Sequence, residues 1–209
     1  SCTIAVNDDG TVSLVEGSVD IGGTRTSIAM QAAEVLGIAA EDINPTVVDT
    51  DSVGFTALTA GSRTTFATGW AAYEAAQDVK KQMMERAATI WETEPDAVAF
   101  DKGQFSSKNG TDHSMSFKEL ARKLPATGGP IVGRATVNPK GAGGSFAGNI
   151  VDLEVDPETG KTTILRYTAV QDVGKAIHPS YVEGQMQGGS VQGIGWALNE
   201  EYYMSEDGQ

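Results

Sequence analysis

Alternating apolar and polar residues predict a β-hairpin at the start of the chain. Residues 3–6 and 11–15 both alternate in this way, and the sequence Asn-Asp-Asp-Gly lies between them. An Asp-Gly pair between two such runs favours a tight turn. Residues 146–155 and 162–170 alternate around a second turn at residues 157–160, and they predict the clearest antiparallel hairpin of the chain.

Apolar residues that recur every three or four positions predict three long helices. The first ends at Leu36, because the following Gly37 is a common helix terminator. Its start is expected to be capped by one of three hydroxyl side chains: Thr24, Thr26 or Ser27. The second covers about residues 65–92, and its expected buried face consists of Phe66, Trp70, Tyr73, Ala76, Val79, Met83, Ala87 and Ile90.

The third helix begins near Pro179 and is rich in glycine, which costs roughly 1 kcal/mol per residue against alanine in a helix interior. One face is nearly bare and consists of Gln185, Gly189, Gly193 and Ala197. A mostly apolar row can enter a core and consists of Val182, Met186, Ser190, Ile194 and Leu198. The bare face indicates either close packing against another backbone or a ligand near the amide of Gln185.

The remaining pattern predicts an α+β fold, with antiparallel hairpins and a mixed sheet packed against a few long helices. Strands are expected at residues 43–48 and 131–137, with a small hairpin at residues 98–105 and a short helix at residues 117–124. No repeat, linker or internal boundary is visible. Both ends have the character of cut ends, so residues 1–209 are expected to be part of one domain of a longer polypeptide.

Composition and charge exclude several classes of function. The formal net charge of −13 argues against nucleic acid or an anionic membrane as a partner. The single cysteine, Cys2, excludes an internal disulfide, and His113 and His178 lack the spacing of zinc or haem ligands. No run approaches a membrane span of roughly 20 apolar residues, and no signal peptide is visible, so a cytoplasmic protein is expected.

Three patches of glycine, hydroxyl and amide groups are the candidates for binding chemistry: residues 22–27, 61–65 and 185–193. The first two precede predicted helices, and a helix N-terminus offers free N–H groups and a positive dipole end to an anion. The second patch closes a long hydroxyl-rich loop, residues 49–65. No catalytic triad, nucleophile elbow or phosphate-binding loop motif is present. Together the patches favour a large polar ligand that contains phosphate.

The order of these patches resembles the molybdopterin-binding large subunit of the molybdenum hydroxylases, the xanthine dehydrogenase and aldehyde oxidoreductase family. The similar sequences are Asp-Ile-Gly-Gly at residues 20–23, Thr-Ala-Gly-Ser-Arg-Thr at residues 59–64, Asp-Val-Gly at residues 172–174 and Val-Glu-Gly-Gln at residues 182–185. They extend over nearly the whole chain. The resemblance implies a molybdenum-cofactor-binding-domain-like fold and identifies the chain as a fragment of the second half of the subunit.

The resemblance also implies roles for specific residues. Cofactor-binding residues would be Gly22, Gly23, Thr24, Gly61, Ser62, Arg63, Thr64 and Gln185, with no metal ligand and no catalytic residue among them. The cofactor would be molybdopterin with molybdenum, possibly as the cytosine dinucleotide. The family hydroxylates aldehydes or N-heterocycles with water as the oxygen source. Implied partners are the remainder of the large subunit and the iron–sulfur and flavin domains or subunits that take up the electrons.

Two departures from the family pattern limit this interpretation. Gly23 stands where the family has the glutamine of a Gly-Gln-Gly turn, so one side-chain contact is lost. The catalytic glutamate of the family lies in a Gly-Glu motif beyond these residues, so the fragment alone is expected to be inactive and free of cofactor. Two alternatives stay open: a non-catalytic interaction domain in which the glycine-rich helix serves close packing, and a domain that binds another phosphoester.

Overall fold

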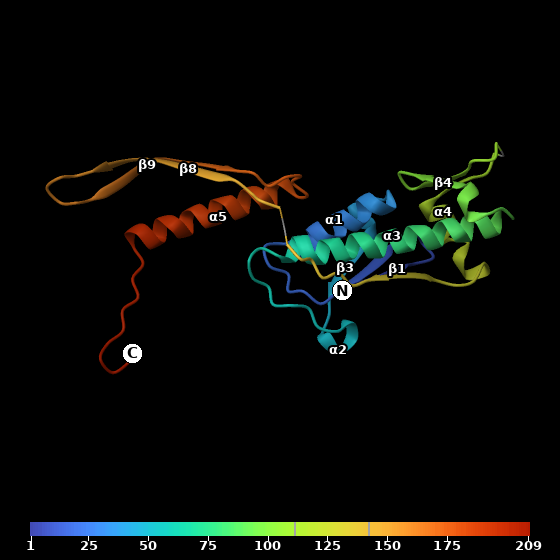
Figure 1. Ribbon diagram of the computed structural model, residues 1–209, viewed down its shortest axis with the longest axis horizontal. Helices are drawn as coiled ribbons and strands as arrows, with labels where there is room; N and C mark the ends of the chain where they lie inside the picture. The colour runs from blue at the N-terminus through green and yellow to red at the C-terminus, as the bar shows by residue number, and fades with distance from the viewer. Residues whose placement is uncertain (111, 142) are drawn as a thin grey trace. The chain divides into compact units, whose positions relative to one another are not determined.

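The chain forms two structural units, Ser1–Lys140 and Gly141–Gln209, which we call the N-terminal and C-terminal units. The computed structural model describes residues 1–110, 112–141 and 143–209 (Figure 1). Helices and strands are mixed within both units, in agreement with the predicted α+β class. No helix in these described ranges is long and apolar enough to cross a membrane.

A mixed four-stranded sheet organises the N-terminal unit. Strands β1 (Cys2–Val6) and β2 (Val12–Glu16) form the predicted antiparallel hairpin, β7 (Ile131–Ala135) pairs antiparallel with β1, and β3 (Ile43–Val47) pairs parallel with β2. The order is therefore β3-β2-β1-β7. In β1 and β2 every second residue is buried, so the alternation read from the sequence gives the sheet one core face.

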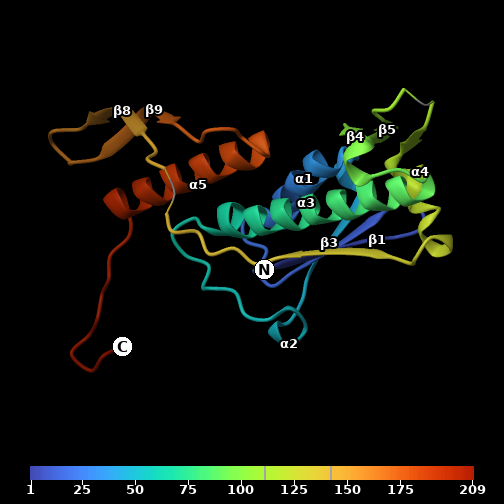
Figure 2. The same ribbon diagram turned by 45° about the vertical axis from the view of Figure 1, so that its right-hand side comes forward.

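Two helices pack on this core face and lie side by side (Figures 1 and 2). They are α1 (Thr24–Leu36) and α3 (Thr64–Ile90), which agree with the first two predicted helices. Gly37 ends α1 in the left-handed conformation with φ of 63°, as expected for a glycine terminator. The core between sheet and helices contains Ile4, Leu14, Ile28, Val79 and Met83, all with 0% exposure.

The predicted buried face of α3 is wrong in its first half. Phe66, Trp70 and Tyr73 are each 42% exposed, whereas a row of small residues is buried: Ala67, Ala71, Ala72, Ala75 and Ala76. The reason is the short distance to the neighbouring elements. A Cβ atom built at Gly133 of β7 would collide with the carbonyl oxygen of Ala75, so only small side chains fit between α3 and the sheet.

Short elements complete the N-terminal unit. They are η1 (Ala40–Asp42), α2 (Thr50–Val53), η2 (Pro95–Ala97), β4 (Val98–Asp101), β5 (Gln104–Ser107), β6 (Ser114–Ser116), α4 (Phe117–Ala121) and η3 (Leu124–Ala126). The strands β4, β5 and β6 form an antiparallel sheet in that order. Ser116 caps α4 together with Glu119 in a capping box, as the predicted cap at Ser116 requires. The helix α2 interrupts the loop expected at residues 49–65.

The C-terminal unit consists of a long hairpin and one helix. Strands β8 (Ala147–Val155) and β9 (Thr162–Gln171) pair antiparallel as predicted, with a register shift at Asp152 and Leu153. The helix α5 (Pro179–Leu198) begins at the predicted proline. None of its residues is fully buried. The apolar row that could enter a core is its least exposed side, since Val182, Met186, Ser190 and Ile194 are half-buried.

The bare face of α5 does not contact another backbone in the described residues. A Cβ atom built at Gly189 or Gly193 meets no atom within 4 Å. Close packing at these glycines, one of the two interpretations of the helix, is therefore not found among the residues that the structure describes.

Candidate functional site

The first predicted turn lies between β2 and α1 and has a left-handed backbone at both glycines. Gly22 has φ of 61° and Gly23 has φ of 75°, values that glycine adopts without strain. Gly23 is the N-cap of α1 and makes no side-chain bond, so the predicted cap by Thr24, Thr26 or Ser27 is wrong. The carboxylate of Asp20 takes this role, because its Oδ1 accepts a hydrogen bond of 2.9 Å from the amide of Arg25.

At this turn the first amides of α1 already have acceptors, so they are not the free N–H groups that the sequence pattern predicted. The amide of Thr24 donates to the carbonyl of Ile21 at 3.3 Å, and the amide of Thr26 donates to Gly23 at 3.2 Å. Asp20 also forms an ion pair with Arg25, at 3.3 Å. Its negative charge occupies the positive end of the helix dipole. The first amides of α1 are therefore satisfied by neighbouring residues of the chain. The sequence signal for this cap is an aspartate two residues before a glycine pair.

The second turn lies before α3 and stays open. Ser62 has φ of 56°, in the left-handed region that a residue with a side chain adopts at a cost. Arg63 is the N-cap of α3 but makes no cap bond, and its guanidinium Nη1 donates to the carbonyl of Ala57 at 3.2 Å. Within the described residues, the amides of Thr64, Thr65 and Phe66 donate to no carbonyl. A long helix thus presents unpaired donors and its positive end at this turn.

Hydrogen bonds between distant segments link the regions around the two turns within the N-terminal unit. The hydroxyl of Thr56 donates to the carbonyl of Gly17 at 3.0 Å. On α1, Nε2 of Gln31 donates to the carbonyl of Thr65 at 3.3 Å. The helices α1 and α3 run in the same direction, so the turns that precede them lie at the same end of the pair (Figures 1 and 2). Sequence reasoning missed Gln31, because its partner lies 34 positions further along the chain.

A buried carboxylate, Glu16, lies at the end of β2 just before the first turn. Its exposure is 1%, and Oε2 accepts a hydrogen bond of 2.5 Å from the amide of Ser18. Burial raises the pKa of the Glu16 carboxyl, and hydrogen bonds from Ser18 oppose that change. Cys2 pairs with Glu16 across the β1–β2 ladder, and burial raises the pKa of its thiol to about 12. Cys2 is therefore a thiol at neutral pH and a poor nucleophile.

The third predicted position, Gln185, belongs to the C-terminal unit. It is an exposed residue in the second turn of α5, and its amide makes no hydrogen bond with the described part of the chain. A free amide supplies one acceptor and two donors to a ligand. In the described ranges, no group of three or more His, Cys, Asp and Glu side chains is placed to hold a metal ion.

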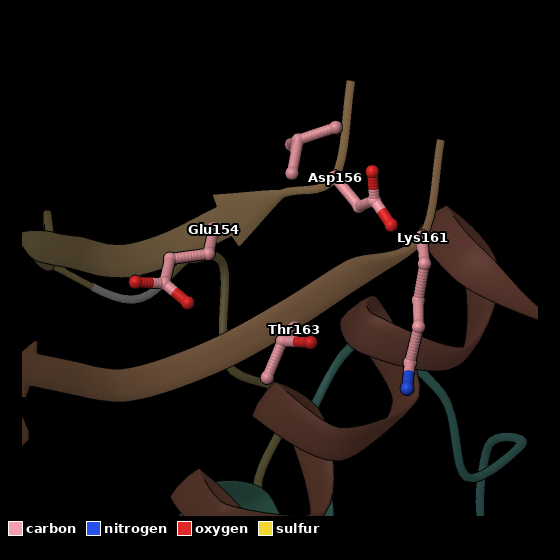
Figure 3. A pocket seen from close by; sticks show the side chains of 5 residues that line it. Glu154, Asp156, Lys161 and Thr163 are labelled. Atoms are coloured by element: carbon pink, nitrogen blue, oxygen red, sulfur yellow. The ribbon is translucent and has the colours of Figure 1, made fainter. Parts of the chain in front are cut away.

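A hollow of about 360 Å³ lies at the tip of the β8–β9 hairpin and contains none of the predicted site residues. The side chains of Glu154, Asp156, Lys161 and Thr163 line it (Figure 3). The carboxylate of Asp156 accepts from the amide of Glu158 at 2.8 Å, and this bond lowers the pKa of Asp156. The polar groups here stabilise a hairpin turn.

The chain is similar to molybdenum-binding proteins along its whole length. Residues 1–209 match the family described as the molybdopterin cofactor-binding domain. The gamma subunit of the 6-hydroxypseudooxynicotine dehydrogenase complex of Paenarthrobacter nicotinovorans is 33% identical over 218 residues, which cover 99% of this chain and 27% of the relative. The large chain of carbon monoxide dehydrogenase of Afipia carboxidovorans is 29% identical over 214 residues, covering 100% of this chain and 26% of the relative.

Solved structures agree with this result. The Cu,Mo-CO dehydrogenase in its carbon monoxide reduced state is similar with a TM-score of 0.87 and 27% identity, over 100% of this chain and 27% of that chain. Quinoline 2-oxidoreductase from Pseudomonas putida is similar with a TM-score of 0.80 and 25% identity. The chain spans about a quarter of the length of these proteins.

Proposed function

Because the chain belongs to the molybdopterin cofactor-binding domain family, we propose that it forms part of the cofactor-binding large subunit of a molybdenum hydroxylase. The family match over residues 1–209 supports this most directly. The chemistry of the second turn adds to it, because the cofactor contains phosphate and the start of α3 has unpaired N–H groups within the described residues.

The eight predicted residues have different roles in this proposal. Gly61, Ser62, Arg63 and Thr64 bind phosphate oxygens through backbone amides, hydroxyls and one guanidinium. Gly22 and Gly23 have no side chain, so the cofactor approaches their backbone closely, and Thr24 adds a hydroxyl. The first turn is a contact surface, since Asp20 already caps α1. The amide of Gln185 serves as donor and acceptor to the pterin ring.

The molybdenum cofactor, when bound, supplies the two-electron oxidation of substrate with water as the oxygen source. The residues of this chain bind and orient it. We propose an aldehyde or an N-heterocycle as the substrate class of the whole protein. The catalytic glutamate would belong to another part of the large subunit, and iron–sulfur and flavin partners would accept the electrons.

The test is the full-length protein, purified and analysed for molybdenum and pterin. The substitution Arg63→Ala is expected to lower the content of both by about tenfold, because a charge-assisted contact to phosphate is lost. Arg122→Ala is the matched control, since Arg122 is an exposed arginine that directly follows α4 in the same unit, and it is expected to change nothing. A full-length protein that contains neither molybdenum nor pterin would overturn the proposal.

A further inference from the structure

We propose that Glu16 is a positioning residue of this site, which fixes the first turn against the helix that follows the second turn by way of Ser18 and Thr68. The inference rests on the proposed function, and it adds a residue that lies outside the two turns. Glu16 does not reach the ligand in this proposal. It acts on the loop between β2 and α1 and thereby on the distance between the two turns.

The geometry consists of two consecutive hydrogen bonds between buried groups. Oε2 of Glu16 accepts from the amide of Ser18 at 2.5 Å, and Oγ of Ser18 lies 2.5 Å from Oγ1 of Thr68. Exposure is 1% for Glu16, 5% for Ser18 and 3% for Thr68. Buried polar side chains destabilise a core unless they are hydrogen-bonded, so each of these bonds constrains its partners strongly.

The positions of Glu16, Ser18 and Thr68 in the chain explain why the bond between Ser18 and Thr68 restricts the first turn. Glu16 is the last residue of β2, Ser18 lies four residues before Gly22, and Thr68 lies in the second turn of α3. Movement of the first turn relative to the start of α3 therefore breaks the bond between Ser18 and Thr68. The side-chain amide of Gln31 lies against Gly69 and donates to the carbonyl of Thr65 at 3.3 Å, so a second hydrogen bond links α1 to the start of α3.

The charges around Glu16 show that it is a poor choice for stability alone. In the sheet, Glu16 pairs with Cys2 of β1 and Val47 of β3, and from α3 the nearest polar partner is Thr68, reached through Ser18. The negative charge of Asp20 raises the pKa of Glu16, and the amino group of Ser1 lowers it. No ion pair between the described residues includes Glu16. An apolar residue would pack in this position at a lower desolvation cost. The carboxylate supplies a directional bond that an apolar residue does not.

The experiment compares four variants of the full-length protein. Glu16→Leu removes the acceptor, Glu16→Gln retains one, and Thr68→Val removes the hydroxyl at the other end with little change in shape. Thr89→Val is the control, because Thr89 is an exposed threonine of α3 far from the turns. The readouts are molybdenum and pterin content, and hydrogen exchange of the amides at residues 17–27.

Glu16→Leu and Thr68→Val are expected to lower cofactor content by about tenfold, a loss typical of residues that orient a site from behind. Exchange at residues 17–27 should increase in both. Glu16→Gln should restore at least half of the cofactor content, and Thr89→Val should resemble the wild type. If Glu16→Leu does not fold, Thr68→Val and Glu16→Gln still test the link.

Two results would overturn the inference. Unchanged cofactor content and exchange in Glu16→Leu and Thr68→Val would reduce Glu16 to an ordinary core residue, while a loss of cofactor in Arg63→Ala would leave the proposed function intact. A wild-type protein without molybdenum or pterin would overturn the proposed function and, with it, the role of Glu16 at a cofactor site.

Discussion

The two units of the chain differ in where their apolar side chains lie. Every buried apolar residue in the described ranges belongs to the N-terminal unit, from Cys2 to Ile131. In the C-terminal unit no described apolar side chain is fully buried, and many large ones are exposed, for example Phe146 at 80%, Ile150 at 63% and Trp196 at 72%. The N-terminal unit is therefore stabilised by its own core, whereas the C-terminal unit has regular hydrogen bonding without one.

Because of this difference, the two turns and Gln185 are held in place to different degrees. The two turns are attached to α1 and α3, which are held by the core and by the hydrogen bonds of Thr56 and Gln31. Gln185 is attached to a helix in which no described residue is fully buried. An isolated hairpin and helix are marginal in water. We therefore expect the turns to be preorganised by this chain and Gln185 to be positioned by whatever covers α5 and the hairpin.

The largest expected effect comes from cutting the chain between the units. A polypeptide of residues 1–140 should unfold in one cooperative transition with urea, because it retains the whole core. A polypeptide of residues 141–209 should show no cooperative transition by circular dichroism. If the second polypeptide unfolds cooperatively on its own, the comparison between the units is wrong.

A smaller effect should come from adding one methyl group in each unit. Gly133→Ala places a Cβ atom against the Ala75 carbonyl and the Val79 side chain, so it should destabilise the N-terminal unit by about 1–3 kcal/mol. The Cβ atom added by Gly189→Ala meets no atom within 4 Å, so this substitution should stabilise α5 by about 1 kcal/mol through helix propensity. Urea unfolding measures the first change, and hydrogen exchange of the α5 amides measures the second.

The pair of substitutions also tests the alternative function. If α5 serves close packing in the full-length protein, Gly189→Ala should destabilise that protein, because the new methyl group would meet the partner backbone. A stabilised or unchanged full-length protein would exclude tight packing at this glycine.

The smallest expected effect concerns the caps of α1. Asp20→Ala removes the acceptor for the Arg25 amide and should destabilise the N-terminal unit by about 1 kcal/mol, the usual cost of a lost helix cap. Asp8→Ala is a suitable control, since Asp8 is an exposed aspartate in the turn between β1 and β2. Equal unfolding midpoints for the two variants would show that the Asp20 cap contributes nothing.

Local sequence patterns were sufficient to predict most of the helices and strands. The Asp-Gly turn between β1 and β2, the terminator Gly37 and the Ser116 cap all act within a few residues, and all three agree with the structure. The buried face of α3 was not predictable in this way. Both its aromatic row and its alanine row have helical spacing, and the close approach of Gly133 to Ala75 selects the alanines.

The sequence by itself determined the class of the fold, the order of its elements and, through the family resemblance, the two turns and the glutamine proposed to bind the cofactor. Only the tertiary structure decided that Asp20 closes the start of α1 while the start of α3 stays open. It also decided that Ser18, whose amide donates to Glu16, meets Thr68. The physical reason is distance along the chain: Ser18 and Thr68 are 50 positions apart, and only packing of α3 onto the sheet brings their hydroxyls together.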